Sequence, residues 1–384
     1  MTTTNVKFLN KDKSTFFPVL RTRIEQYFQE NKICKSGGSP IVGKAICMLS
    51  LYLVPYVLIL SNLFPAWAML VLSGIMGIGI AGVGMSVMHD ANHGSFSTSP
   101  WINQLFSGSL YLLGGNVYNW KIQHNTLHHT YTNIDQLDSD ITGKPFLRLC
   151  DQQRLHKMHR YQHLYAFLLY GLMTFSFLVK DFRQVAEFNR KAKQKLTKAF
   201  STREIAVLLV SKLLYVFFVG VLPLLLTDIT FGQWVIGFLL MNFVAGFVLS
   251  VIFQLAHIIE EVHSPIQNDQ GNIENAWAIH QLESTANFSG HWLMSWCIGG
   301  LNYQIEHHLF PSISHVHYPA IAPIVRETAR QYGLPYYQKT SIFDALGSHI
   351  NMLKKLGRHA GQTVAAQRVV CTPQQVISSS QPIG

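Results

Sequence analysis

The sequence predicts an all-α integral membrane protein, in which four transmembrane helices form two hairpins beneath a helical cap on the cytosolic side. Three observations support this fold class. Hydrophobic residues make up 48% of the chain and charged residues only 13%, about half the charged fraction of ordinary soluble proteins. Four apolar runs are each about as long as a bilayer crossing. Many of the 18 histidines gather near the ends of these runs.

Residues 1–40 are polar and basic, and we expect a cytosolic N-terminal region without a cleavable secretory signal. Residues 15–31 within it are predicted to form an amphipathic helix, because apolar residues recur at helical spacing at Phe16, Phe17, Leu20, Ile24 and Phe28. Such a helix can lie on a membrane surface. It can equally pack on the protein's own cytosolic part, and the pattern leaves both alternatives open.

The first predicted hairpin consists of apolar runs at about 41–60 and 66–88, joined by residues 61–65. Its second run contains Gly77, Gly79 and Gly82, which match the GxGxxG spacing of a nucleotide-binding loop. No predicted strand precedes these glycines, and they lie inside a run of membrane length. We therefore interpret them as small residues that let two membrane helices approach closely.

The second predicted hairpin consists of the runs 204–226 and 233–254, joined by residues 227–232. Neither hairpin loop contains a Lys or Arg, whereas the N-terminal region, the middle of the chain and the C-terminal part contain nearly all of them. Cytoplasmic segments of membrane proteins carry the excess of basic residues. Both termini and the middle segment are therefore predicted to face the cytoplasm.

The rest of the chain is predicted to form the cytosolic cap, over residues 89–203 and 255–356, so that the membrane domain covers 41–356. Two moderately apolar pieces, 101–117 and 161–179, fall within the cap. Glycines interrupt the first and basic residues flank the second, so we place both at the membrane interface or in a half-buried position. The polar tail, 357–384, is predicted to be disordered.

Charge and cysteine content narrow the functional classes. The net charge of +10 is compatible with nucleic-acid binding, but the basic residues flank apolar runs and form no patch interleaved with aromatic residues. We therefore expect a lipid bilayer as a partner and no nucleic acid. The five cysteines have no paired spacing, so no disulfide framework is expected.

Eight histidines are predicted to lie on one side of the membrane, close to the ends of the crossings. They are His89, His93, His124, His128, His129, His257, His307 and His308. Neutral imidazole is the commonest metal ligand. Eight imidazoles exceed the positions around one ion, so we expect two metals. Nitrogen-rich ligation suits Fe, Cu, Zn or Ni, and the set lacks the thiolates that are usual in structural zinc sites.

Carboxylates near these histidines are expected to accept the second ring N–H and so fix the imidazole orientation. The candidates are Asp90, Asp138, Glu260 and Glu306. Asp140 and Glu261 are also close in sequence, although a solvated charge is an equally good interpretation for them. Ten further histidines fit no spacing pattern and are expected not to be ligands: His156, His159, His163, His263, His280, His291, His315, His317, His349 and His359.

Three motifs, His-Asp-Ala-Asn-His at 89–93, His-Asn-Thr-Leu-His-His at 124–129 and Gln-Ile-Glu-His-His at 304–308, resemble the histidine boxes of the integral-membrane fatty acid desaturase family. The resemblance extends from about residue 51 to 310. It implies a di-iron centre, O2 as co-substrate, and removal of two hydrogens from a CH2–CH2 pair of an acyl chain. It also implies that the eight histidines are the iron ligands, with His257 as the additional one after the last crossing.

Gln304 stands where many members of this family have His. Glutamine there resembles the front-end type, such as linoleoyl-CoA (delta-6-type) desaturases. Its amide is expected to bind metal directly, hold a water or hydrogen-bond to a neighbour. The fused cytochrome b5 domain of some such enzymes, with its His-Pro-Gly-Gly motif, is missing from the sequence. Electrons are therefore expected from a separate ferredoxin or cytochrome b5-type carrier, whose acidic surface would suit a basic cytosolic face.

The acyl substrate, linked to CoA or to a lipid, is expected in an apolar tunnel between the hairpins and the cap. Trp120 is the candidate for its wall, with Asn119 and Lys121 for head-group contacts, although Trp120 is equally suited to anchor at the membrane interface. Two alternatives remain: a di-iron hydroxylase, ketolase or sphingolipid desaturase, and a metal-transporting or metal-binding membrane protein. The transporter alternative predicts ionisable residues inside the crossings. The four runs contain them only near their ends, at Lys44, Glu204 and Lys212.

Overall fold

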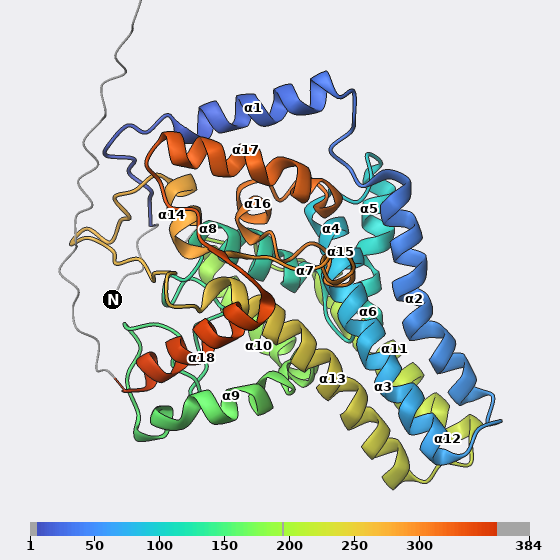
Figure 1. Ribbon diagram of the computed structural model, residues 1–384. Coiled ribbons are helices and arrows are strands. Elements are labelled where there is room, and N and C mark those ends of the chain that lie inside the picture. Colours follow the sequence, from blue (N-terminus) through green and yellow to red (C-terminus); the bar gives the residue numbers. More distant parts are fainter. Residues whose placement is uncertain (1–5, 194–195, 359–384) are drawn as a thin grey trace, which may run out of the picture.

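The computed structural model describes residues 6–193 and 196–358, and these residues are predominantly helical (Figure 1). The helices of the first half are α1 (Phe16–Glu30), α2 (Gly38–Leu60), α3 (Ala66–Gly82), α4 (Met88–His93), α5 (Pro100–Ser107), α6 (Ser109–Leu112), α7 (Val117–Trp120), α8 (His129–Tyr131), α9 (Gln162–Tyr170) and α10 (Met173–Lys193). Those of the second half are α11 (Thr202–Tyr215), α12 (Leu222–Leu226), α13 (Phe231–His257), α14 (Trp277–Ser284), α15 (Trp292–Cys297), α16 (Gln304–Leu309), α17 (Tyr318–Gln331) and α18 (Ile342–Arg358). Strands β1 (Asn287–Phe288) and β2 (Gln338–Lys339) pair in parallel, with Asn287 opposite Gln338.

Four helical segments are long and apolar enough to cross a membrane: Gly38–Leu60, Ala66–His93, Thr202–Leu226 and Phe231–His257. They overlap the four predicted runs. The second and fourth extend beyond the predicted ends, because the helical backbone continues through polar residues that are buried inside the protein. As a result, His93 and His257 are the last residues of two long helices.

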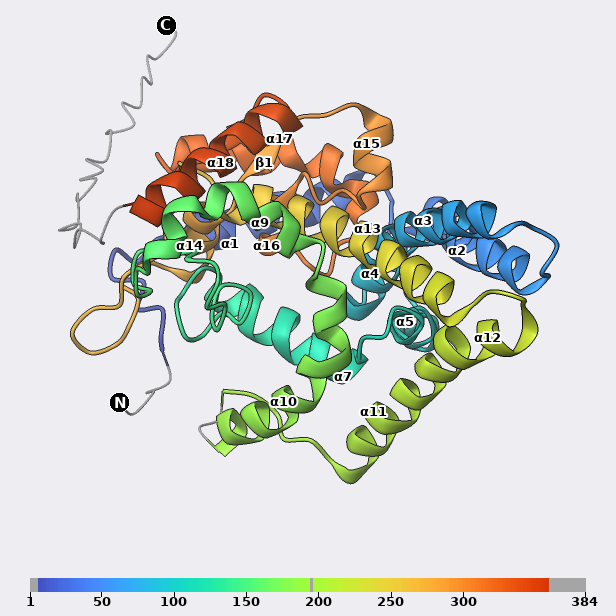
Figure 2. The same cartoon turned by 90° about the horizontal axis from the view of Figure 1, so that it is seen from below.

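Close contacts with glycine explain how three of the long helices pack together. A Cβ atom on Gly77 would lie 2.5 Å from the carbonyl oxygen of Met241 in α13, and one on Gly79 would lie 2.6 Å from the backbone of Leu51 in α2. Only glycine permits such an approach, so the interpretation of this motif as a packing motif is confirmed. Figures 1 and 2 show α3 beside both α2 and α13, whereas α11 diverges from α13 beyond their connection.

Helix α1 packs on the protein itself. Its buried face consists of Phe16, Leu20, Ile24 and Phe28, which share one apolar cluster with residues of α16 and α17. Figure 1 shows α1 lying along α17. The amphipathic pattern left two alternatives open, a membrane surface or the protein itself. In the structure the protein's own C-terminal part covers the apolar face of α1.

The apolar piece predicted at 161–179 is bent rather than straight. Helices α9 and α10 meet at 86°, and only together do they pass the length and hydropathy criteria for a crossing. The bend lies against α13, where a Cβ atom on Gly171 would be 2.2 Å from the ring of Phe243. The piece predicted at 101–117 forms the short helices α5 and α6 and the first residue of α7.

The C-terminal boundary differs slightly from the expectation. Helix α18 extends to Arg358, because its apolar face, which includes Leu353 and Leu356, is buried against residues near α9. The remainder of the expected tail, 359–384, lies outside the described residues, as does His359.

Candidate metal centre

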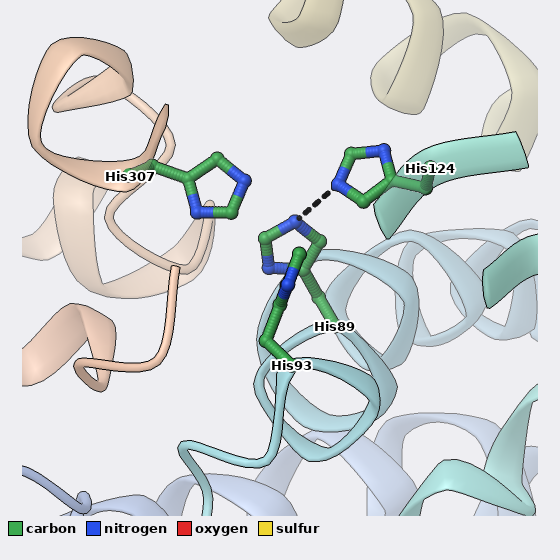
Figure 3. Close-up of side chains that lie close together, drawn as sticks. All are labelled: His89, His93, His124 and His307. Atoms are coloured by element: carbon green, nitrogen blue, oxygen red, sulfur yellow. Dashed lines mark hydrogen bonds between the residues drawn. The ribbon is translucent and has the colours of Figure 1, made fainter. Parts of the chain in front are cut away.

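The eight predicted histidines converge at the end of the long helices. His89 and His93 lie on α4, and His257 ends α13. The segment 121–129 contributes three, His307 and His308 come from α16, and all eight except His93 are buried. Figure 3 shows the rings of His89, His93, His124 and His307 turned toward one another.

The first histidine group consists of His89, His93, His124 and His307, whose ligand nitrogens all lie within 4.8 Å of one another. The Nε2 atoms of His89 and His124 are 3.2 Å apart, as the dashed line in Figure 3 indicates. The ring centroids of His89 and His307 are 4.5 Å apart. Four convergent imidazoles at this spacing form a pocket of the size that one transition-metal ion requires.

The second histidine group consists of His128, His257 and His308, whose ligand nitrogens also lie within 4.8 Å of one another. His129 lies between the two groups, because its nitrogen is within the same distance of His307 and His308. The ring of His129 stacks on that of His308 with centroids 4.4 Å apart. The two groups are therefore adjacent, as expected for a dinuclear site.

A π-helix carries the middle histidines. The segment Lys121–His128 has this wider winding, and α8 begins at His129. The rings of His124 and His128 stack, with centroids 5.2 Å apart, but His124 belongs to the first group and His128 to the second. π-helical turns inside helices are rare and often lie at functional sites. A second one, Val83–Val87, precedes α4.

The protonation state of the cluster suits metal binding. Burial, followed by the repulsion of neighbouring imidazoles, lowers the pKa of His124, His129, His307 and His308 well below the ordinary value. These side chains are therefore neutral, with a nitrogen lone pair available. The Nε2 atoms of His93, His128, His257, His307 and His308 are buried without a hydrogen-bond partner among the described residues. Buried polar atoms normally have partners, so this donor set fits two metal ions of the nitrogen-preferring kind.

Asp138 is the carboxylate that the structure brings directly to the cluster. Its Oδ2 atom accepts a hydrogen bond from Nδ1 of His128 at 3.0 Å, and Oδ1 accepts from the backbone N–H of Asp140 at 2.8 Å. Burial alone would lower the pKa of His128, but Asp138 and then Asp140 raise it above the ordinary value. The half-buried Asp140 lies 3.4 Å from the same ring nitrogen. Because this hydrogen bond occupies Nδ1 of His128, Nε2 is the nitrogen left for a metal ion shared with His257 and His308.

The other orienting groups are neutral, and none was predicted from the sequence. Nδ1 of His257 lies 3.2 Å from the carbonyl oxygen of Ser284, and Nδ1 of His308 lies 2.8 Å from Oε1 of Gln281. Nδ1 of His307 is 3.1 Å from the hydroxyl of Tyr318. These partners lie on different helices from the histidines that they contact, so no local spacing pattern could have indicated them.

Three other carboxylates expected beside the histidines have different principal contacts. Asp90 lies 3.8 Å from Nδ1 of His89, and its closer contacts are His315, at 2.9 Å, and Ser314, at 2.7 Å. Glu306 is buried, but its side chain points away from the cluster. It accepts hydrogen bonds from Asn287 at 2.7 Å and from the hydroxyl of Tyr336 at 2.8 Å.

Glu260 is exposed, and its carboxylate accepts a hydrogen bond from Asn351 at 3.3 Å. It lies three residues beyond the end of α13, where the chain turns and directs this side chain to the surface. The prediction that Glu260 and Glu306 hydrogen-bond to the histidines, which was based on proximity in sequence, is therefore wrong. His315 occupies the place beside Asp90, and Nε2 of His315 also contacts the buried Lys44 at 2.7 Å.

Gln304 is buried at the start of α16, three residues before His307, and only 1% of its surface is exposed. Neither the oxygen nor the nitrogen of its amide has a hydrogen-bond partner among the described residues. A buried amide without partners costs free energy. Because no described residue satisfies this amide, a water or a metal ion is the kind of partner that would remove the cost.

An apolar cavity of about 630 Å³ begins at the cluster. Trp120, His124, His128 and His257 are among its lining residues, and the ring of Trp120 lies 4.4 Å from that of His124. Trp120 therefore lies at the expected wall position. Asn119 does not line this cavity; it is buried and donates to the carbonyl oxygen of Asp181 at 3.1 Å. Lys121 lines a separate cavity of about 960 Å³.

The remaining histidines of the described residues take no part in the two groups. His349, for example, contacts the carbonyl oxygen of Ile258 at 2.7 Å and the hydroxyl of Tyr170 at 2.9 Å. His159 contacts the carbonyl oxygen of Pro145 at 3.1 Å. The hydrogen bonds of His349 and His159 are therefore structural.

Long apolar helices that end in two adjacent groups of histidines define a class of proteins: membrane proteins with a histidine-rich site that could hold metal ions. The sequence pattern of one family within this class, described as fatty acid desaturase, matches residues 65–340. The chain therefore belongs to the fatty acid desaturase family, and it is an enzyme of that kind.

Characterised relatives are similar over most of their length. The sn-1 linoleoyl-lipid 6-desaturase of Arthrospira platensis is 32% identical over 361 residues, which cover 93% of this chain and 96% of the relative. The enzyme of the same name from Synechocystis sp. is 31% identical over 93% of this chain and 99% of its own. The acyl-lipid (8-3)-desaturase of Physcomitrium patens is 33% identical over 92% of this chain and 74% of its own.

Proposed function

We propose that this enzyme introduces a cis double bond near the carboxyl end of a lipid-linked acyl chain, with two iron ions and O2. The observation that carries the proposal is the junction of the two histidine groups with the apolar cavity, which would bring a methylene pair beside the metals. The names of the relatives support an acyl-lipid substrate rather than acyl-CoA, and a front-end position such as carbon 6.

The balanced reaction is –CH2–CH2– + O2 + 2 e⁻ + 2 H⁺ → –CH=CH– + 2 H2O. Iron, when bound, supplies the oxidising chemistry with O2. The chain's own contribution is to hold the ligands and the substrate in place. Asp138, Gln281 and Tyr318 orient three ligand rings, and the apolar cavity wall excludes water from the reacting carbons.

The apolar cavity also has a cationic part that suits a polar head group. Lys144, Lys180 and Arg183 are among its lining residues. Nζ of Lys180 donates to Oε1 of Gln123 at 3.2 Å, and Nε2 of Gln123 donates to Asp140 at 2.6 Å. This chain of contacts links the cationic part of the cavity to His128, and so would fix the distance between the acyl ester and the metals.

The proposal includes an orientation in the membrane. The four long helices would cross the bilayer as two hairpins, and the metal centre, the cap and both termini would lie on the cytosolic side. The distribution of Lys and Arg supports this orientation, because basic residues accumulate on the cytoplasmic side of membrane proteins. Electrons would then arrive from a soluble or membrane-anchored cytosolic carrier.

The test is expression of the full chain in a host that is fed defined fatty acids, with double bonds mapped by mass spectrometry. We expect a new cis double bond on the carboxyl side of an existing one. It should appear in the lipid fraction earlier in time than in the acyl-CoA fraction. The purified protein should contain about two iron ions per chain. The variant His128→Ala should insert in the membrane but lose product formation. Hydroxylated products, or unchanged lipids despite bound iron, would refute the proposal.

A further inference from the structure

Two segments of the chain supply different parts of the apolar cavity lining. Helix α10 supplies the cations Lys180 and Arg183, whereas residues 110–128 supply Trp120 and the histidine His124. In the proposed function, the acyl ester binds near the cations and the reacting carbons lie near the histidines. The placement of α10 relative to residues 110–128 therefore determines which methylene pair reaches the metal centre.

A buried lysine on a membrane-length helix joins these two segments. Lys212 lies within Thr202–Leu226, only 8% of its surface is exposed, and its Nζ atom donates to three oxygens. Two of them belong to α10, namely the carbonyl oxygen of Phe177 and Oδ2 of Asp181, each at 2.6 Å. The third is the carbonyl oxygen of Gly114, which lies between α6 and α7. All three N–H donors of the ammonium group are therefore used on these two segments.

Asp181 makes a second link from α10 to the segment that carries the middle histidines. Its buried carboxylate pairs with Lys212, while its backbone carbonyl oxygen accepts from Nδ2 of Asn119 at 3.1 Å. Asn119 lies five residues before His124, so this hydrogen bond acts close to the first histidine group. Neither Asp181 nor Asn119 lines the cavity, and both therefore act from behind its wall.

The close packing around Gly114 leaves little freedom at this junction. Gly114 has a positive φ of 75°, and a Cβ atom on it would lie 3.1 Å from the ring of Tyr215 and 3.2 Å from Leu178. Tyr215 belongs to α11 and Leu178 to α10. Gly114 is thus fitted between the two helices at the point where Lys212 binds its carbonyl group.

Gln123 connects α10 to the same segment from the cavity side. Its Oε1 atom accepts from Lys180 at 3.2 Å and from Gln184 at 2.8 Å. These contacts do not involve Lys212. If Lys212 is replaced, we therefore expect α10 to shift slightly rather than to detach from residues 110–128.

Stability alone is a poor explanation for the buried pair of Lys212 and Asp181. Taking two charges out of water costs free energy, and apolar side chains in the place of a buried ion pair are often at least as stable. Directed hydrogen bonds, by contrast, hold three elements at fixed distances. Ionisable residues inside membrane segments commonly have a functional role of this kind.

We propose that Lys212 is a positioning residue that fixes α10 against residues 114–119, and so sets the distance between the cationic part of the apolar cavity and the metal centre. It thereby selects the carbon pair that is dehydrogenated, counted from the ester end of the acyl chain. Lys212 does not line the cavity, so it acts through Asp181 and Gly114. This inference rests on the proposed function, because it concerns where the new double bond is placed.

The test uses the full-length chain, expressed in a host that is fed fatty acids of several chain lengths. The variants are Lys212→Met and the double variant Lys212→Met with Asp181→Asn. The single variant leaves a buried carboxylate without its cation, so its unfolding temperature should fall, whereas the double variant leaves no unpaired charge. The matched control is Lys339→Met, which removes an ion pair with Glu261 at a place that lines neither cavity.

We expect the natural protein to place the new double bond at one position counted from the carboxyl carbon, whatever the chain length. The double variant should give a mixture in which part of the product is shifted by about one or two carbons, with total product reduced about tenfold at most. Its iron content and its unfolding temperature in nanodiscs should stay close to those of the natural protein. Lys339→Met should give the natural position and the natural yield.

A third variant, Asn119→Ala, removes the second link without leaving a charge unpaired. It should give the same kind of mixture, with a smaller share of shifted product. Double-bond mapping by mass spectrometry reads both variants, and a merely structural role would lower the yield without moving the double bond.

The outcomes separate this inference from the proposed function. A single unchanged position in the double variant would overturn the role of Lys212, and so would a double variant that does not fold or a control that shifts the position equally. In each of these cases the natural protein still forms product. If the natural protein forms no new double bond, the proposed function itself fails.

Discussion

The carboxylate of Asp138 lies 3.0 Å from Nδ1 of His128, and both side chains are buried. Because an ionised carboxylate only accepts hydrogen bonds, this contact places the proton on Nδ1 and leaves Nε2 as the metal-binding atom. His128 belongs to the second histidine group, so a change at Asp138 should act on that group first.

The variant Asp138→Asn should therefore bind iron more weakly. The amide can present its nitrogen to His128, which favours the wrong tautomer. We expect a loss of about 10- to 100-fold in iron affinity, with one ion lost before the other. Metal analysis after graded chelator treatment measures this. The control is Glu260→Gln, an exposed side chain outside the cluster; iron loss equal to that of the control would contradict the role of Asp138.

Glu306 makes stability depend on pH in the metal-free protein. Burial raises the pKa of its carboxyl from 4.5 to about 7. A carboxyl whose pKa is raised on folding favours the folded state when it is protonated, so stability should fall as pH rises between about 4.5 and 7.

The variant Glu306→Gln removes this titration while keeping an oxygen acceptor for Tyr336. We expect its unfolding temperature in nanodiscs to equal that of the natural protein near pH 5 and to exceed it at pH 8. Differential scanning calorimetry across this range is the measurement. A difference that grows toward acidic pH would show that the sign is wrong.

Gln304 should show opposite effects on stability and on turnover. The variant Gln304→Leu removes two buried polar atoms that lack partners, so the metal-free protein should gain about 1–3 kcal/mol of unfolding free energy. Turnover should fall at least about tenfold if the amide holds a water or contacts a metal. Denaturant titration and product analysis are compared on the same preparations. Loss of stability would mean that the amide has an internal partner.

Gly84 should limit how far an acyl chain extends into the apolar cavity. It lines this cavity, and a Cβ atom on it would lie 3.1 Å from Leu249. The variant Gly84→Val adds bulk there, so we expect a preference for chains that are shorter by about two carbons, with iron content unchanged. Competition between fatty acids of different length, read by mass spectrometry, tests this. If the variant has a normal iron content and an unchanged preference for acyl-chain length, the methyl end of the acyl chain does not lie near Gly84.

The apolar runs and the histidine spacing predicted much of the molecule. Membrane-length runs depend only on composition, so the structure has helices at all four positions. The histidines of the two groups were predictable because most of them stand within five residues of another one, as His89 and His93 do. The π-helix at 121–128 was not, because its residues have no composition that distinguishes it from an α-helix.

The residues around the histidines were harder to predict, because tertiary contacts select them. Gln281 and Tyr318 reach His308 and His307 from other helices, whereas Glu306, the immediate neighbour of His307, points elsewhere. Lys121 is adjacent to Trp120 in sequence, yet the two side chains line different cavities. Adjacent residues on a helix face different directions, so proximity in sequence was a poor guide here.

Each histidine group contains one member of the pair His307 and His308. During synthesis, the residues from 89 to 257 leave the ribosome long before this pair, and the first group then has three of its four imidazoles and the second has two of its three. Neither group is complete until residues 307 and 308 have emerged, about four fifths of the way along the chain, and α16 has been covered by α1 and α17. A metal ion that needs the full set of ligands can therefore bind only late in biogenesis, and a chain truncated before residue 307 would have three imidazoles for the first group and two for the second.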